Sequence, residues 1–105
     1  MKLEVANTIR SRLVGLLGRS EFDGVLLLVP CNDVHTFGMK RSLDIAFASA
    51  EGRIIEAHRN VGPNRRLRNR RAKATLERFS SDDPWYEPGD SIHEGLTDDS
   101  TLNHR

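Results

Sequence analysis

Two extended segments joined by a two-residue turn constrain the fold of this chain more than any other feature. Residues 43–50 alternate between large apolar and small or polar side chains, and residues 53–61 form a second extended segment. The Glu-Gly pair at residues 51–52 between them is typical of a turn. Consecutive strands with such a short link predict an antiparallel β-hairpin.

The flanking segments complete the predicted architecture. An apolar run at residues 25–29, bounded by Gly24 and Pro30, indicates a buried strand. Residues 8–19 carry apolar side chains at i, i+4, i+7 and i+8, which predicts one amphipathic helix. Residues 72–79 fit a helix or a strand equally well. The sequence therefore predicts an α+β domain, in which one N-terminal helix packs on a small antiparallel, barrel-like sheet.

The size and composition are those of one folded domain. The chain has 105 residues, of which 37% are hydrophobic and 30% charged, and this is enough for one modest core. We expect residues 1–94 to form a single compact domain. Residues 95–105 carry little apolar mass, so we expect them to be a frayed C-terminal tail.

Charge and hydropathy limit the classes of partner. A net charge of +1 gives no overall field toward nucleic acid or a membrane. The apolar run at residues 25–30 is too short to span a bilayer, and residues 1–6 lack the apolar core of a signal peptide. Together with a single cysteine, these features predict a cytoplasmic protein without an internal disulfide. We expect a monomer, or a weak homodimer formed through an exposed strand edge.

Residues 31–47 concentrate polar chemistry in a segment that is otherwise typical of a strand. The segment holds a thiol at Cys31, an imidazole at His35, a hydroxyl at Thr36 and two carboxylates, one of them at Asp44. Polar groups crowded into an apolar segment indicate a ligand site or a hydrogen-bond network that fixes the fold.

The same segment carries a family signature. A Cys-x-x-x-His-Thr-Phe-x-Met pattern begins at Cys31 and continues into the apolar residues 43–47. The remaining blocks of the signature follow in the family's order: Arg-x-x-Gly-Leu-x-x-Arg at residues 12–19, a glycine-led strand at 24–28, Gly-Arg-Ile-Ile at 52–55, Leu-Glu at 76–77 and Pro-Gly-Asp at 88–90. Over residues 5–92 the chain resembles the family of small bacterial domains known as domain of unknown function 192. The resemblance implies a compact, largely β fold and no established activity.

Cys31, His35 and Asp44 are candidate ligands for a transition metal. The spacing argues against this, because residues 31 and 35 of one strand share a face but stand roughly 13 Å apart. If a turn brought the thiol and the imidazole together, they would form the nucleophile–base pair of a thiol enzyme. We assign no metal site and no cofactor, and keep both chemistries as alternatives to a structural network.

A ligand pocket is the functional hypothesis that we favour for this segment. Its polar and apolar side chains would converge as in small-molecule sites; the candidate residues are His35, Thr36, Phe37, Met39 and Asp44. The competing interpretation is that the phenylalanine and the methionine belong to the core. We therefore predict a non-enzymatic binding or accessory module for an unidentified small molecule or protein.

The second candidate site is a run of cations in residues 65–73. It contains Arg65, Arg66, Arg68, Arg70, Arg71 and Lys73. Such a run contacts phosphates, but it lacks the interleaved aromatic residues that stack on bases. We interpret it as a solvated loop or helix turn whose charges face acids within residues 82–87, which argues against a nucleic-acid partner.

Asp44 also has a simpler explanation. A carboxylate on a buried strand accepts hydrogen bonds, and Arg12 and Arg19 on the predicted helix are candidate partners. A buried pair of this kind would hold the helix to the sheet, and breaking it would destabilise the fold by about 3–5 kcal/mol.

Overall fold

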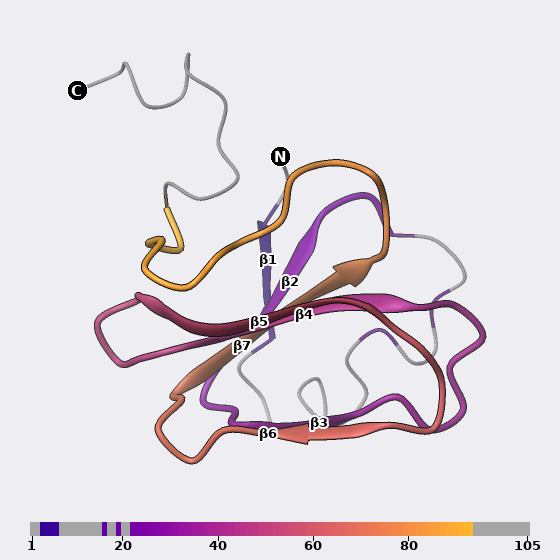
Figure 1. Cartoon of the computed structure of the whole chain (residues 1–105), viewed down its shortest axis with the longest axis horizontal. Helices are drawn as coiled ribbons and strands as arrows, with labels where there is room; N and C mark the ends of the chain where they lie inside the picture. The colour runs from indigo at the N-terminus through magenta and orange to yellow at the C-terminus, as the bar shows by residue number, and fades with distance from the viewer. Residues whose placement is uncertain (1–2, 7–15, 17–18, 20–21, 94–105) are drawn as a thin grey trace.

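The computed structural model describes residues 3–6, 16, 19 and 22–93 (Figure 1). The strands of this part are β1 (Leu3–Ala6), β2 (Val25–Leu28), β3 (Asp33–His35), β4 (Leu43–Ala48), β5 (Ile54–Val61), β6 (Arg66–Arg68) and β7 (Ala74–Phe79). A five-stranded sheet has the order β1-β2-β7-β4-β5, and β3 pairs with β6 in a separate two-stranded ribbon. Figure 1 shows this ribbon beneath the large sheet.

The predicted hairpin is confirmed. β4 and β5 pair in antiparallel fashion around a turn at Gly52, whose φ of 84° suits glycine. The buried strand predicted at residues 25–29 is β2, and the ambiguous segment at residues 72–79 is strand β7. β7 lies between β2 and β4, so these strands form the centre of the sheet.

Each face of the sheet carries its own core. The large apolar side chains of β4, such as Ile45 and Phe47, pack on one face with Val34 and Leu67 of the ribbon. The small residues of β4 lie on the opposite face, where Trp85 packs with residues from the C-terminal part of the described chain. All six residues of β4 are buried, because both faces are covered.

The predicted α+β class is wrong. The described residues form an all-β structure, and the large sheet is mixed because β1 pairs in parallel with β2. The helix expected over residues 8–19 lies outside the described residues except at Leu16 and Arg19. There the backbone N–H of Leu16 donates to Glu77, and the N–H of Arg19 closes a single turn onto the Leu16 carbonyl.

The cationic run and the C-terminal residues were also given predicted structures. The cationic run at residues 65–73 was expected to be a loop or a helix turn. Its first part is instead strand β6, because it pairs with β3, which is distant in the sequence. The expected tail at residues 95–105 lies outside the described residues. In the described part of the chain, no helix is long and apolar enough to cross a membrane.

Candidate functional site

The β3–β6 ribbon brings the two sites predicted from the sequence onto one surface. Its register sets His35 opposite Arg66 and Asp33 opposite Arg68. Directly opposed residues of an antiparallel pair project from the same face, with Cβ atoms roughly 5 Å apart. Val34 and Leu67, also opposed, face the core. The outward face therefore carries the imidazole and the guanidinium groups together.

An aromatic pair extends this face beyond the end of β3. The rings of His35 and Phe37 stack with centroids 5.0 Å apart and an interplanar angle of 25°. The backbone N–H of Phe37 donates to Nδ1 of His35 over 3.2 Å. This bond fixes the ring pair and leaves the proton of a neutral imidazole on Nε2. His35 is exposed and Phe37 is 50% exposed, so the stack faces solvent.

A tight turn holds Phe37 in this exposed place. The N–H of Met39 donates to the Thr36 carbonyl over 3.1 Å, which closes a four-residue turn with Phe37 at its second position. Gly38 occupies the third position with a φ of 82°, as a type II turn requires. Met39 itself is buried in the core beneath the ribbon. The turn thus presents one aromatic residue and anchors itself with the next large side chain.

Thr36 ties this turn to the start of the arginine run. It is 1% exposed, and its hydroxyl donates to the Gly62 carbonyl over 2.7 Å and accepts from the Arg65 N–H over 2.9 Å. Its backbone N–H also donates to the Arg65 carbonyl over 2.8 Å. Thr36 therefore has a structural role: it fixes the distance between the aromatic pair and the first arginine of the run.

The cations of the run differ in their partners. Arg66 donates from Nε and Nη2 to both carboxylate oxygens of Asp33, and this bond holds the pKa of Asp33 below its usual range. Burial raises the pKa of Glu56, but hydrogen bonds from His58 and Asn69, together with nearby charges that include Arg71, hold this pKa below its usual range. Within the described residues, no ion pair or side-chain hydrogen bond engages the guanidinium groups of the others: Arg65, Arg68 and Arg70.

Cys31 and His35 have different partners. The half-buried thiol of Cys31 donates to the Asp33 carbonyl oxygen over 3.5 Å, whereas Nδ1 of His35 is engaged by Phe37. Asp44 lies on the central sheet and bonds to other residues. Among the described residues, no cluster of three or more histidine, cysteine or acidic side chains forms a metal site. The geometry thus provides neither the thiol–imidazole contact nor the ligand set of the two alternatives.

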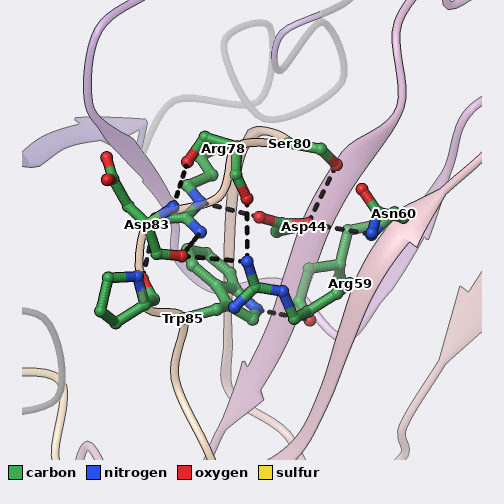
Figure 2. Close-up of polar contacts among 10 residues, drawn as sticks. Asp44, Arg59, Asn60, Arg78, Ser80, Asp83 and Trp85 are labelled. Atoms are coloured by element: carbon green, nitrogen blue, oxygen red, sulfur yellow. Dashed lines mark hydrogen bonds and ion pairs between the residues drawn. The ribbon is translucent and has the colours of Figure 1, made fainter.

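Asp44 belongs to a second, buried network (Figure 2). Its carboxylate accepts hydrogen bonds from Arg78 Nε over 2.8 Å and from Ser80 Oγ over 2.9 Å. Arg78 also donates to the carbonyls of Asp83 and Pro84, and its guanidinium carbon lies 4.7 Å from the Trp85 ring centroid. The network therefore holds the segment after β7 against the face of the sheet. The predicted buried Asp–Arg pair exists, but its arginine comes from β7 and not from residues 8–19.

A β-bulge completes the network. Leu43 pairs with Val61 and Ile45 with His58, so two residues of β5 face Asp44. Asn60, with a φ of 56°, turns its N–H onto Asp44 Oδ1 at 2.9 Å. Burial raises the pKa of Asp44, but the hydrogen bonds from Asn60, Arg78 and Ser80 and the charge of Arg78 hold the pKa below its usual range.

The comparisons with known proteins agree with the signature. The family model of domain of unknown function 192, described as "Uncharacterized ACR", matches residues 1–80. The chain belongs to this family. The match ends before the Pro-Gly-Asp motif at residues 88–90, which the sequence resemblance had included. No curated protein matches the chain.

Two solved structures share the fold. A protein of unknown function from Novosphingobium aromaticivorans DSM 12444 superposes with a TM-score of 0.72 at 21% identity, over 87% of this chain and 73% of that one. A putative transcription regulator from Sinorhizobium meliloti 1021 superposes with a TM-score of 0.65 at 22% identity, over 74% of this chain and 67% of that one. At these identities the likeness establishes the fold.

In this domain of unknown function 192, the residues of the signature segment lie in two separate parts of the fold. Residues 31–39 form the ribbon strand and its turn, and they present the exposed aromatic pair. Asp44 lies in β4 and enters the buried network on the other face of the sheet. The five predicted ligand residues therefore do not line one pocket: His35 and Phe37 are exposed, while Thr36, Met39 and Asp44 are buried.

Glu77 is the buried carboxyl group that the sequence analysis did not single out beyond the Leu-Glu motif. It lies on β7, 4% exposed, and its Oε1 accepts the Leu16 N–H over 3.0 Å. Burial raises the pKa of Glu77 to about 7, although the Leu16 hydrogen bond acts in the opposite direction. Had residues 72–79 been assigned as a strand, period-2 alternation would have placed Glu77 on the face of Thr75 and Phe79, toward the apolar core.

A cleft of about 290 Å³ opens beside the buried network. Its lining includes Phe22, Arg41, Arg78, Phe79 and Ser81. Arg41 lies over the Phe79 ring, 4.1 Å from its centroid, and Arg78 is fully engaged by the network. Because its two arginines are engaged in this way, we prefer the ribbon as the candidate site.

Proposed function

We propose that this chain is a non-enzymatic binding module that holds a phosphate-bearing ligand on the outward face of the β3–β6 ribbon. One observation carries the proposal: the register that sets His35 of the exposed aromatic pair opposite Arg66. The sequence separates the two candidate sites by about thirty residues, and strand pairing makes them one surface.

The local charge favours an anionic ligand. The run of residues 65–73 carries six cations, and the acids placed against it are Asp33 and Glu56. The surface thus keeps an excess of positive charge although the chain as a whole is nearly neutral. Such a local field steers anions to one face of a protein.

The backbone of the surface is already fixed. Thr36 bonds to Arg65, the Asn69 N–H donates to the Asn32 carbonyl over 2.9 Å, and the Lys73 N–H donates to the Ala48 carbonyl over 2.8 Å. A preorganised surface loses less conformational entropy on binding than a flexible loop. This feature supports recognition by the ribbon over a merely solvated arginine run.

Inorganic polyphosphate tests the proposal, because it presents phosphates without any base or side chain. We expect it to raise the Tm of the domain at low salt, and the increase to disappear as salt is added. Arg68→Ser should weaken this effect. The matched control is Arg53→Ser, which removes an equally exposed charge whose guanidinium donates to the Gly89 carbonyl away from the ribbon.

Two outcomes would contradict the proposal. One is the absence of any salt-dependent Tm increase. The other is an equal loss in Arg53→Ser and Arg68→Ser, which would mean that overall charge and not the ribbon attracts the polyphosphate.

A further inference from the structure

We propose that the phosphate-bearing ligand of the ribbon is single-stranded nucleic acid, with a base stacked on the His35–Phe37 pair and its phosphates on Arg65 and Arg68. This inference rests on the proposed function and names the ligand class of the same surface. It requires three features of the ribbon: an exposed aromatic pair, guanidinium groups that no hydrogen bond or ion pair holds, and a backbone that is fixed between the rings and the arginines.

The aromatic platform is open. Phe37 is 50% exposed although it is a large apolar residue, and the turn through Gly38 holds it away from the core. Its stack with His35 and the hydrogen bond to Nδ1 fix both rings before any ligand arrives. Sequence-tolerant binding of single strands uses aromatic side chains of this kind, since every base offers a ring face.

Two arginines share the outward face of the ribbon with His35. Arg66 lies directly opposite His35, and Arg68 lies two residues further along the same face. Asp33 already holds Arg66, so phosphate contacts fall to Arg68 and to Arg65, whose backbone is fixed by Thr36. The charge of Arg68 acts on Asp33, but no hydrogen bond or ion pair among the described residues holds the guanidinium of Arg68 or Arg65. Both groups therefore keep their N–H donors for the phosphates of a nucleotide stacked on the rings.

The geometry favours a single strand over a duplex. In a duplex the ring faces of the bases are covered by their neighbours, so an exposed aromatic pair has nothing to stack on. β3 and β6 have three residues each, too few to follow a groove. The objection from the sequence, that the run lacks interleaved aromatic residues, does not hold in three dimensions, because β3 and the turn that follows it supply the aromatic rings.

Fluorescence anisotropy with labelled oligonucleotides of about 12 nucleotides tests the inference, because that length fits the site sizes of single-strand binders. The probes are a single-stranded oligothymidylate, a duplex of the same length, and inorganic polyphosphate as a competitor without bases. The protein is the full chain at fixed low salt.

Phe37→Leu is the decisive variant, because it keeps an apolar side chain but removes the ring. Loss of stacking should weaken binding of the single strand roughly 10-fold and leave polyphosphate binding unchanged. Phe37→Tyr keeps the ring and should bind like the original. Arg68→Ser should weaken the binding of both the single strand and polyphosphate. For the single strand, the magnitude of the slope of log K against log salt should fall by about 0.7 if one phosphate contact is lost.

The outcomes separate the inference from the proposed function. Equal binding of oligothymidylate and polyphosphate, insensitive to Phe37→Leu, would overturn the inference and leave the proposed function standing. Duplex binding as tight as single-strand binding would overturn the inference in the same way. Absence of binding to all three probes would overturn both. A single-strand preference that Phe37→Leu removes and Phe37→Tyr keeps would establish the inference.

Discussion

The ribbon and the buried network each contain an aspartate bonded to arginine Nε, and they differ in what surrounds the pair. In the ribbon, the Asp33 and Arg66 side chains are 31% and 62% exposed. In the network, the Asp44 and Arg78 side chains are 0% and 5% exposed, and further hydrogen bonds come from Ser80 and from the backbone. Water screens the first pair, whereas the second depends on complete pairing. The same pair of side chains is thus screened by water at the surface and enclosed by further hydrogen bonds inside.

The largest expected effect comes from breaking the buried pair. Asp44→Asn keeps the shape of the side chain but leaves the Arg78 charge without its anion, which should lower the free energy of unfolding by about 3–5 kcal/mol. Asp33→Asn makes the same change in the exposed pair and should alter stability little. Urea denaturation measures both variants. Similar losses in the two variants would contradict the contrast between the two regions.

Glu77 should produce a pH dependence of stability that the ribbon does not share. Its pKa is about 7 in the folded chain, against 4.5 for a glutamate in water, so the folded state binds more protons between these two pH values. The free energy of unfolding should therefore fall by about 3 kcal/mol as pH rises from 4.5 through 7. Three other carboxylates have lowered pKa values: Asp33, Asp44 and Glu56. Their contributions to the free energy of unfolding act in the opposite direction, because they are lost as the pH falls into the acidic range.

The control for this pH effect is Glu77→Gln, which still accepts the Leu16 N–H but does not ionise. The difference in unfolding free energy between Glu77→Gln and the original should grow from pH 5 to pH 8. A difference that stays constant over this range would mean that Glu77 does not titrate there.

A substitution at Thr36 tests how much its hydroxyl hydrogen bonds stabilise the ribbon. Thr36→Val keeps the side-chain volume but leaves the Gly62 carbonyl and the Arg65 N–H without their hydroxyl partner. We expect a loss of about 1–3 kcal/mol in thermal or urea unfolding. Thr75→Val removes a single donor, to the Cys31 carbonyl, and should lose less. A Thr36→Val domain as stable as the original would show that the ribbon does not need this clamp.

The smallest effect on stability is expected for the exposed aromatic pair of His35 and Phe37. His35→Ala removes a side chain whose ring contacts Phe37 at the surface, so the free energy of unfolding should change by no more than about 0.5 kcal/mol. The melting curve measures this change directly. Strong destabilisation by His35→Ala would assign the signature histidine to the fold and remove it from the binding surface.

The sequence was most informative where local pattern decides the structure. The hairpin of β4 and β5 followed from alternation and a short turn, and β2 followed from a run of apolar residues. β7 remained undecided, because residues 72–79 carry no periodicity that separates a helix from a strand. Once β7 is known to pair with β4, Arg78 falls opposite Asp44, and the partner of the buried carboxylate becomes evident.

For the candidate site, the sequence indicated the residues but not their arrangement. Three residues of the ribbon's outward face, His35, Arg66 and Arg68, were named from the sequence, yet they were assigned to two separate hypotheses, one for the segment around His35 and one for the arginine run. Each of β3 and β6 is too short to be recognised alone, and each exists because the other pairs with it. The family signature could mark His35 and Phe37, but it could not show which of its side chains face outward.

What the sequence by itself determined is the local pattern: an alternating hairpin, a buried strand and a dense cationic run. Only the tertiary structure decided that Asp44 bonds to Arg78 inside while Asp33 bonds to Arg66 outside, and that His35 lies opposite the run. The physical reason is that alternation and turn preference act over a few residues, whereas strand pairing and burial depend on residues that are distant along the chain.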